Sequence, residues 1–334
     1  MLVIRRKYVS YWEENMKNTV FLNSDRVDFD GKLDFSPLEK VTTLTKYNKS
    51  SAKDILERVQ NQNIIITKEV PLGRDLINKF PDSVELICEA GTGYNNIDIV
   101  AAKEKNIVVC NLPGYSTEGV AQLVIGFILD LSSSISIQQN MIRQGNFNNF
   151  TKYLGVPHSE VQGKTLGVIG SGSIGKQVIK VARALDMNIL VYSRTLKQWN
   201  DDKIQNVSLE TLLKESDFIT IHCPLTKQTK HMISKENLKI MKPSAFIINT
   251  ARGAIINEVD LIEALKKRLI AGAALDVQDV EPLSKESPLF LMDNVIITPH
   301  IGWKCLESRQ RLIDYLANNI KAFIQGNPIN IVSH

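Results

Sequence analysis

The sequence predicts an α/β fold with two doubly wound parallel sheets, each in its own domain. Short apolar runs alternate with helix-like stretches along most of the chain, and this alternation is typical of a parallel sheet covered by helices on both faces. One alternation carries a glycine turn, residues 170–175, between a strand and a helix. The length of 334 residues is sufficient for two hydrophobic cores.

The first part of the chain contains four strand-like runs and one clear helix. The helix is predicted over residues 52–59. The strands are predicted at residues 20–22, 64–66, 84–88 and 107–110. Residues 1–15 lack the apolar segment of a secretory signal, and a predicted strand follows Met16 closely. We therefore expect Met16 to be the natural start and residues 1–15 to be an extension outside the fold.

A long helix is predicted over residues 117–138. Apolar side chains recur there at the spacing of one helix face, at Val120, Leu123, Val124, Phe127, Ile128 and Leu131. Such a stripe is most simply part of the core, although it could also be buried against a partner subunit.

The second part of the chain continues the alternation. Strands are predicted near residues 166–169, 189–192, 217–221, 245–249, 270–275 and 295–297, with helices between them. Asn257 is expected to cap the helix that contains Leu261 and Leu265. The last helix, residues 308–323, is expected to return to the first domain, so that the chain crosses between domains near residues 111–113 and near Gly302.

The glycine turn predicts a dinucleotide site. Gly170, Gly172 and Gly175 permit a tight turn and a close approach of the backbone to a pyrophosphate at the helix N-terminus, with Ser173 and Ile174 beside it. The spacing alone is a weak signal. Its position between a strand and a helix, with a further strand following, makes it much more specific.

Composition and charge argue against several other classes. A net charge of +4 without a clustered basic stripe does not favour nucleic acid as a partner, and no apolar run is long enough for a membrane span. The four cysteines are scattered and show no zinc-type spacing with the histidines, so no metal site is expected. Reduced thiols indicate a cytoplasmic protein.

Polar side chains follow the predicted strands of the second part, where open parallel sheets place their ligands. They are Arg252, Asp276, Glu281 and His300. An arginine can hold a carboxylate and polarise a carbonyl, and a histidine can protonate the alkoxide that forms when a hydride arrives. A carboxylate partner can favour the protonated imidazole. The set therefore predicts carbonyl reduction.

At these motifs the chain resembles the D-isomer-specific 2-hydroxyacid dehydrogenases, and the glycerate dehydrogenase or hydroxypyruvate reductase branch in particular. The resemblance runs from Thr19 to Val332. Its signatures occur in order at residues 90–98, 170–175, 222–226, 249–253, 275–282 and 298–300. The family pattern often has aspartate at Asn95 and glutamate at Gln122, and neither departure affects the arginine, glutamate and histidine.

The resemblance implies a Rossmann-type dinucleotide-binding domain at residues 113–302. It also implies a flavodoxin-like substrate-binding domain at residues 16–112 and 303–334. Arg252, Glu281 and His300 would be catalytic, with Arg252 and His300 also binding substrate. Thr92 and Gly93 would hold the substrate carboxylate through their backbone amides. Cys223, Pro224, Thr250 and Asp276 would contact the cofactor, Asp276 at the nicotinamide carboxamide.

The segment Ser193, Arg194 and Thr195 predicts the cofactor. An NAD enzyme usually has a carboxylate at the position of Ser193 to bind the ribose 2′-hydroxyl. Serine, arginine and threonine suit a 2′-phosphate instead. We therefore expect NADP(H) to be preferred, with NAD(H) possible.

The expected substrate is a small 2-oxo or 2-hydroxy acid, with hydroxypyruvate or glyoxylate favoured. D-lactate dehydrogenation or reduction of another 2-oxo acid is an alternative. A non-catalytic corepressor that senses nucleotides is a further alternative, since proteins of this fold can keep the same residues without catalysis. The resemblance also implies a homodimer built partly on residues 117–138.

Overall fold

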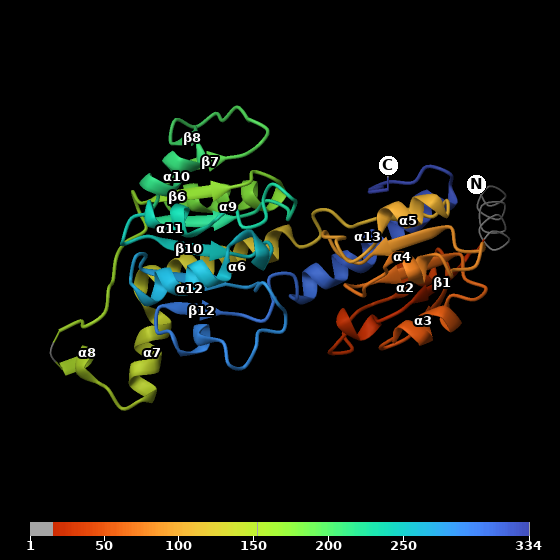
Figure 1. Ribbon diagram of the computed structural model, residues 1–334, viewed down its shortest axis with the longest axis horizontal. Coiled ribbons are helices and arrows are strands. Elements are labelled where there is room, and N and C mark those ends of the chain that lie inside the picture. Colours follow the sequence, from red (N-terminus) through yellow and green to blue (C-terminus); the bar gives the residue numbers. More distant parts are fainter. Residues whose placement is uncertain (1–15, 152, 334) are drawn as a thin grey trace, which may run out of the picture. The chain divides into compact units, whose positions relative to one another are not determined.

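The computed structural model describes residues 16–151 and 153–333, so the expected extension, residues 1–15, lies outside the described residues. The chain divides into two compact units. Among the described residues, unit 1 comprises residues 16–116 and 304–333, and unit 2 lies within Thr117–Trp303. Each unit contains a parallel sheet with helices on both faces (Figure 1). This confirms the predicted fold class.

Unit 1 has five parallel strands in the order β2-β1-β3-β4-β5. Their bounds are β1 Asn18–Phe21, β2 Thr43–Lys46, β3 Ile64–Thr67, β4 Leu86–Glu89 and β5 Val108–Cys110. Every residue of β3 and β4 is buried, which explains their continuous apolar runs. The edge strand β2 was not predicted, because its sequence Thr-Leu-Thr-Lys is polar and mostly exposed.

Helices cover both faces of this sheet. On one face lie α3 Ala52–Arg58, α4 Arg74–Ile77 and α5 Ile99–Glu104, whose apolar side chains share a core with Val20, Ile65, Ile87 and Val109. The short α2 Ser36–Glu39 packs against the long α13 Leu306–Ile324, which also contacts β4. Ser51 begins α3 with a capping box, and the Asp98 side chain caps α5.

Unit 2 has seven parallel strands in the order β12-β11-β10-β9-β6-β7-β8. Their bounds are β6 Thr165–Ile169, β7 Asn188–Tyr192, β8 Ile204–Asn206, β9 Phe218–Ile221, β10 Phe246–Asn249, β11 Gly272–Leu275 and β12 Val295–Ile297. The order reverses between β6 and β9, the switch point at which doubly wound sheets bind ligands. The edge strand β8 was not predicted.

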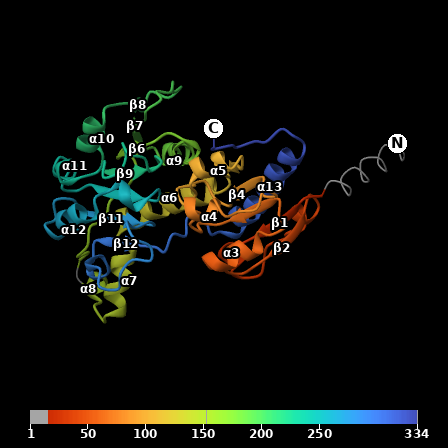
Figure 2. The same cartoon turned by 45° about the vertical axis from the view of Figure 1, so that its right-hand side comes forward.

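Alternate side chains of the central strands enter two separate cores. Val168, Val191 and Ile248 face α6 Thr117–Ser133 and α9 Ser173–Ala184. Ile169, Ile219 and Ile247 face α10 Leu209–Glu215, α11 Lys235–Lys239 and α12 Glu258–Lys266 (Figure 2). The Asn257 side chain accepts a hydrogen bond from Asp260 N, which confirms the predicted cap of α12.

The prediction of a single helix over residues 117–138 is wrong. It is broken at Ser134, which has a φ of +51°, and a second helix, α7 Ile135–Arg143, leaves at a bend of 63°. Ser134 Oγ donates to Pro157 O at 2.6 Å, which helps to fix the break. Among the described residues, no single helix could span a membrane, and only the bent pair α6 and α7 meets the length and composition of a span.

Candidate active site

The glycine turn between β6 and α9 has the geometry of a dinucleotide cradle. Gly170 has a φ of +98°, and a Cβ there would lie 2.8 Å from Cys223 N. A Cβ on Gly175 would lie 2.1 Å from Gly170 O, so helix and turn pack too closely for any side chain. A Cβ on Gly172 would meet nothing within 4 Å. The open side of the turn, at the start of α9, is therefore where a pyrophosphate can approach.

Two buried hydroxyls near the ends of the strands support a bound group. Within the described part of the chain, Ser171 Oγ and Thr250 Oγ1 are buried and have no hydrogen-bond partner. Ser171 belongs to the glycine turn, and Thr250 directly follows β10. Buried polar atoms are normally paired. A ligand with hydrogen-bonding groups at this edge would supply the missing partners, so these residues fit a dinucleotide.

The segment after β7 lies beside the glycine turn. Ser193 is half-buried, whereas Arg194 and Thr195 are exposed. Lys197 Nζ donates to Ser171 O, which joins this segment to the turn. Desolvation, and then the nearby Lys176, lower the pKa of Lys197. Lys197 was not predicted to lie near the dinucleotide site. Its position five residues beyond Tyr192, just after β7, was a possible signal.

The residues after β9 pack against the turn. Burial raises the pKa of the Cys223 thiol to about 11, so Cys223 is a neutral packing residue at ordinary pH. Burial also lowers the pKa of His222 to about 3, and Nε2 of His222 lies 2.9 Å from Thr220 Oγ1. His222 is therefore neutral and structural. Pro224, which follows Cys223, is exposed.

The loop after β10 places Arg252. Asn249 is buried, and its side chain accepts from Ala251 N at 3.0 Å and donates to Arg252 O at 2.9 Å. These bonds fix the backbone on both sides of the arginine. A Cβ on Gly253 would lie 1.9 Å from Gln278 C, so this loop is pressed against the loop that follows β11.

Glu281 and His300 form a hydrogen-bonded pair. His300 Nδ1 and Glu281 Oε2 are 2.8 Å apart, with the two side chains 23% and 35% exposed. Gln278 N donates to the other carboxylate oxygen, Oε1, at 3.2 Å. Because Nδ1 is engaged, Nε2 of His300 is the nitrogen that can exchange a proton with another molecule.

Asp276 organises the loop that carries His300. Thr298 Oγ1 and Ile301 N donate to its Oδ1 at 2.6 and 2.7 Å, and Gly302 N donates to its Oδ2 at 2.9 Å. His300 N donates to Asp276 O at 2.9 Å. His300 has a φ of +52°, a conformation that non-glycine residues seldom adopt. The buried carboxylate therefore fixes a strained loop, a role that the sequence did not indicate.

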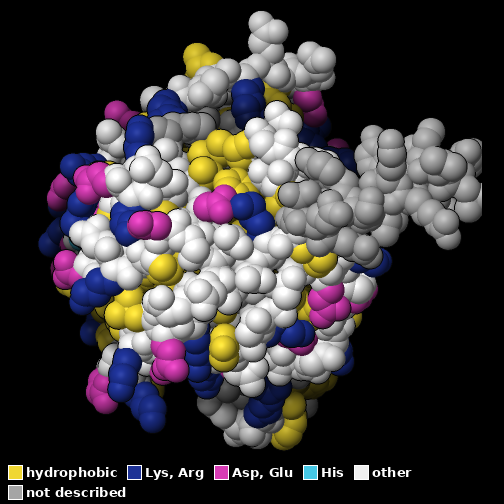
Figure 3. Space-filling model, turned by 90° about the vertical axis from the view of Figure 1, so that its right-hand side faces the viewer, with side chains coloured by type: hydrophobic (Ala, Val, Ile, Leu, Met, Phe, Trp, Pro, Cys, Tyr) yellow, Lys and Arg dark blue, Asp and Glu magenta, His cyan; other side chains and the backbone are white. Residues whose placement is uncertain are grey.

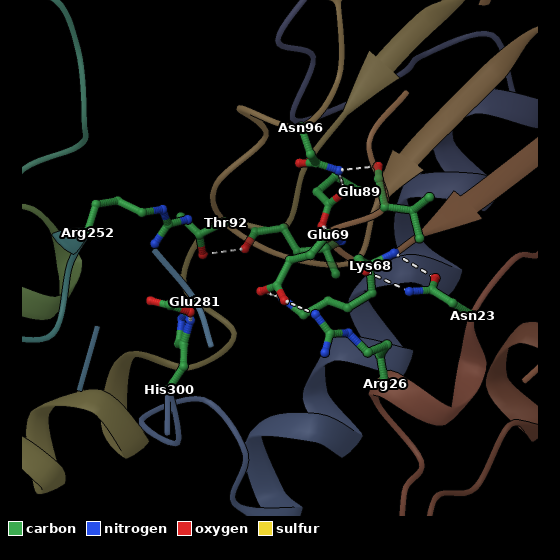
Figure 4. Close-up of polar contacts among 12 residues, drawn as sticks. Asn23, Arg26, Lys68, Glu69, Glu89, Thr92, Asn96, Arg252, Glu281 and His300 are labelled. Carbon is green, nitrogen blue, oxygen red and sulfur yellow. Dashed lines mark hydrogen bonds and ion pairs between the residues drawn. The ribbon is translucent and has the colours of Figure 1, made fainter. Parts of the chain in front are cut away.

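The three catalytic candidates lie on loops that contact one another within unit 2. The Arg252 loop contacts the Gln278 loop, which contains Glu281, and Glu281 bonds His300. In Figure 4 the Arg252 side chain extends in the direction of Glu281 and His300. An arginine, a carboxylate and a proton-donating imidazole at the carboxyl edge of a dinucleotide-type sheet can together reduce a carbonyl group.

Thr92 and Gly93 belong to unit 1, in the turn after β4. Thr92 Oγ1 donates to Leu112 O at 3.0 Å, and Asn111 Nδ2 donates to Thr92 O at 2.7 Å. Leu112 N donates to Gly91 O at 2.9 Å. The turn is thereby tied to the segment that follows β5.

Comparison with known proteins identifies the family. Residues 125–302 match the model of the D-isomer specific 2-hydroxyacid dehydrogenase, NAD binding domain. The chain is 36% identical over 312 residues to a hydroxypyruvate reductase of Blautia hydrogenotrophica, covering 91% of this chain and 96% of that protein. It is 37% identical over 325 residues to a glycerate dehydrogenase of Methylorubrum extorquens, covering 95% and 99%.

A solved structure gives the same result. The D-lactate dehydrogenase of Aquifex aeolicus, complexed with NAD and lactic acid, superposes with a TM-score of 0.82 at 30% identity, covering 95% of this chain and 99% of that one. The chain belongs to the D-isomer-specific 2-hydroxyacid dehydrogenase family and is an NAD(P)-dependent oxidoreductase.

Proposed function

We propose that the protein reduces a small 2-oxo acid, hydroxypyruvate or glyoxylate, to the D-2-hydroxy acid. The observation that carries this proposal is the bond between His300 and Glu281 at 2.8 Å, on loops that contact the Arg252 loop. The names of the relatives, hydroxypyruvate reductase and glycerate dehydrogenase, favour these substrates.

In the proposed reaction, Arg252 binds the substrate carboxylate and orients the carbonyl. The nicotinamide cofactor, when bound, supplies a hydride to the carbonyl carbon. His300 donates the proton on Nε2 to the carbonyl oxygen, so hydride and proton together give the alcohol. Glu281 accepts from Nδ1, which orients the ring and stabilises its charged form. General acid catalysis of this kind contributes about 10²–10⁴ in rate.

The cofactor would bind at the turn formed by Gly170, Gly172, Ser173, Ile174 and Gly175. Its pyrophosphate would take the backbone N–H groups at the start of α9. Ser171 and Thr250 offer hydroxyls with no protein partner in the described chain. The backbone of Cys223 lies beside Gly170, and Pro224 is the next residue in the chain. Asp276 has three donors on its carboxylate already, so we assign it chiefly to positioning the His300 loop.

We infer that NADP(H) is preferred to NAD(H). Ser193, Arg194 and Thr195 replace the carboxylate expected of an NAD enzyme, and Lys197 adds a positive charge beside the turn. The test is kcat/KM with both cofactors for the wild type and for Ser193→Asp. A preference of the wild-type enzyme for NADH would contradict the inference, and Ser193→Asp is expected to shift preference toward NADH.

Unit 1 is assigned to substrate binding, with the amides of Thr92 and Gly93 on the substrate carboxylate. Unit 2 is assigned to dinucleotide binding.

On the face shown in Figure 3, basic and acidic side chains are interspersed. This distribution favours a small-molecule partner over nucleic acid on that face.

A cytoplasmic location is proposed because the cysteines are scattered along the sequence, and it can be tested by cell fractionation.

The decisive experiment is NADPH oxidation with a panel of hydroxypyruvate, glyoxylate, pyruvate and bulkier 2-oxo acids. Pyruvate is included because the Aquifex neighbour is a D-lactate dehydrogenase. Hydroxypyruvate or glyoxylate should give the highest kcat/KM. Arg252→Ala and His300→Ala should each abolish most of the turnover. Turnover that survives both substitutions would disprove the proposed site.

We also propose a homodimer. Helix α7 has no buried residue, and α7 and α8 Asn148–Thr151 stand out from the sheet of unit 2 (Figure 1). Their region exposes large apolar side chains, namely Leu129, Ile135, Phe147, Phe150, Tyr153 and Leu154. A patch of this kind is typical of an interface. Sedimentation should show a dimer that Phe150→Ser weakens, and a monomeric wild type would contradict the proposal.

A further inference from the structure

Unit 1 contains a buried ionic cluster that the proposed reaction does not use. Lys68 directly follows β3 and is 3% exposed, and Glu89 ends β4 and is fully buried. The two strands are neighbours, with Thr67 paired to Glu89. Figure 4 shows Lys68, Glu69 and Glu89 close together. Burying charges in this way is costly, so their position calls for a physical explanation.

The charges alternate from the surface inward. Arg26 Nη2 lies 3.2 Å from Glu69 Oε2, and Lys68 Nζ lies 2.8 Å from Glu69 Oε1. Glu89 accepts from Glu69 N at 3.1 Å and from Asn96 Nδ2 at 2.8 Å. With Glu89 protonated this group carries one net positive charge, and with Glu89 ionised it is neutral.

The inner end of the cluster lies under the turn that contains Thr92 and Gly93. A Cβ on Gly91 would be 3.0 Å from Lys68 Nζ and 3.3 Å from Glu89 Oε1. Ala90 N donates to Thr67 O at 2.7 Å, which fixes the turn above these two side chains. Any change in their charge therefore acts on the adjacent amides through protein rather than through water.

We propose that Lys68 and Glu89 are positioning residues that tune this turn for an anionic substrate. The Lys68 ammonium strengthens carboxylate binding by the turn, and the Glu89 carboxylate weakens it once ionised. This inference rests on the proposed function, since it takes the amides of Thr92 and Gly93 as the carboxylate site.

The protonation states support this coupling. Burial raises the pKa of Glu89 to about 7, although Lys68 and Asn96 act in the opposite direction. Burial disfavours the Lys68 charge, but Tyr115, Glu69 and Glu89 outweigh it and hold the pKa of Lys68 above its usual value.

Two further buried titratable groups beside the cluster, Tyr115 and Cys88, stay neutral near pH 7. Burial raises the pKa of the Tyr115 phenol. The hydrogen bond to Cys110, followed by burial, raises the pKa of the Cys88 thiol. Glu89 therefore changes charge near neutral pH, whereas Tyr115 and Cys88 do not.

The test measures binding rather than turnover. D-glycerate is titrated calorimetrically into NADPH-loaded protein, a pair that cannot react, at about pH 6 and about pH 8.5. The charge of Glu89 would act on the carboxylate of bound D-glycerate over roughly 8 Å. At an effective dielectric constant of about 20–40, this interaction changes the dissociation constant of D-glycerate about tenfold. We expect D-glycerate binding by the wild type to weaken by about that factor at the higher pH. Any pH dependence that remains in Glu89→Gln is subtracted first, because it does not come from Glu89.

Three variants and one matched control sharpen the result. Glu89→Gln should lose the tenfold component without a matching loss in kcat, and Lys68→Met should weaken binding about tenfold or more at the lower pH. Glu85→Gln is the matched control, because it removes a carboxylate about 13 Å away, beside the opposite end of β4. It should leave the pH dependence unchanged. Asn96→Ser removes a bond that favours ionised Glu89, so the midpoint of the binding change should move to higher pH.

The outcomes separate the inference from the proposed function. Circular dichroism establishes that each variant is folded, and Asn96→Ser serves if Glu89→Gln is not. An enzyme that turns over hydroxypyruvate, but whose folded Glu89→Gln or Asn96→Ser variant keeps the wild-type pH dependence of binding, overturns the inference alone. A wild type that neither turns over 2-oxo acids nor binds D-glycerate overturns both.

Discussion

Replacing Asp276 by asparagine tests the main structural feature of the site. The buried carboxylate receives three hydrogen bonds, from Thr298 Oγ1, Ile301 N and Gly302 N, at 2.6–2.9 Å. Asparagine can keep its oxygen toward Thr298 and Ile301. Its amide nitrogen then faces the N–H of Gly302, so one bond is lost and two buried donors oppose each other.

The magnitude follows from these bonds. Hydrogen bonds to a charged group contribute about 1.5–3 kcal/mol each, and a buried donor left without a partner costs about 1–3 kcal/mol. We expect Asp276→Asn to lower the free energy of unfolding by about 2–4 kcal/mol, a Tm decrease of roughly 5–10 °C. A shift of His300 by about 1 Å would lower kcat about 10²-fold.

The assay is thermal unfolding of the cofactor-free protein together with steady-state kinetics. Asp293→Asn is the matched control, because that carboxylate is exposed and forms a surface ion pair with Arg268. If Asp276 instead serves mainly as a cofactor ligand, the KM for NADPH should rise while the cofactor-free Tm stays near that of the control. A variant with the Tm and kcat of the control would refute the positioning role.

Three further predictions concern other parts of the chain. The native state keeps the Glu89 proton up to about pH 7 and the unfolded chain releases it near 4.5, so the wild-type free energy of unfolding should fall by up to about 3 kcal/mol as the pH rises between these values. Denaturant titrations should show no such component in Glu89→Gln. Gly253→Ala places a methyl 1.9 Å from Gln278 C and should cost about 1–3 kcal/mol in the same titrations, and wild-type stability would contradict the close packing. Glu281→Gln should lower kcat by about 10- to 100-fold with little change in the KM for NADPH, because His300 loses its charged partner, and unchanged kcat would refute that role.

The interior strands were predictable from sequence because they are buried on both faces. Runs such as Ile64–Thr67 and Phe218–Ile221 are buried at every position, so their composition alone identifies them. The edge strands β2 and β8 are mostly exposed and polar, so no apolar run marks them. The break at Ser134 was missed because the apolar spacing of α6 was extended past a run of three serines.

The site was predictable only in part, for a related physical reason. Arg252, Glu281 and His300 follow strands or occur in recognisable motifs, so their sequence positions were enough to propose them as site residues. The carboxylate of Asp276 acts through contacts more than twenty residues away, and Lys68 and Glu89 come together only because β3 and β4 pair. Residue type and spacing contain no signal for such contacts, which arise from the register of the sheet.

The division of the chain into units separates two kinds of effect. The bonds from Glu281 and Asp276 that orient His300 and its loop are made within unit 2. The charges that act on the Thr92 turn, from Lys68 and Glu89, are all within unit 1. Changes at Asp276 or Glu281 should therefore appear mainly in kcat, because they disturb proton donation. Changes at Lys68 or Glu89 should appear mainly in the KM for the 2-oxo acid, because they alter binding of an anion and leave the proton donor in place. An equal loss of kcat from substitutions in both units would show that the two sets are coupled, and it would contradict the separate roles assigned to them.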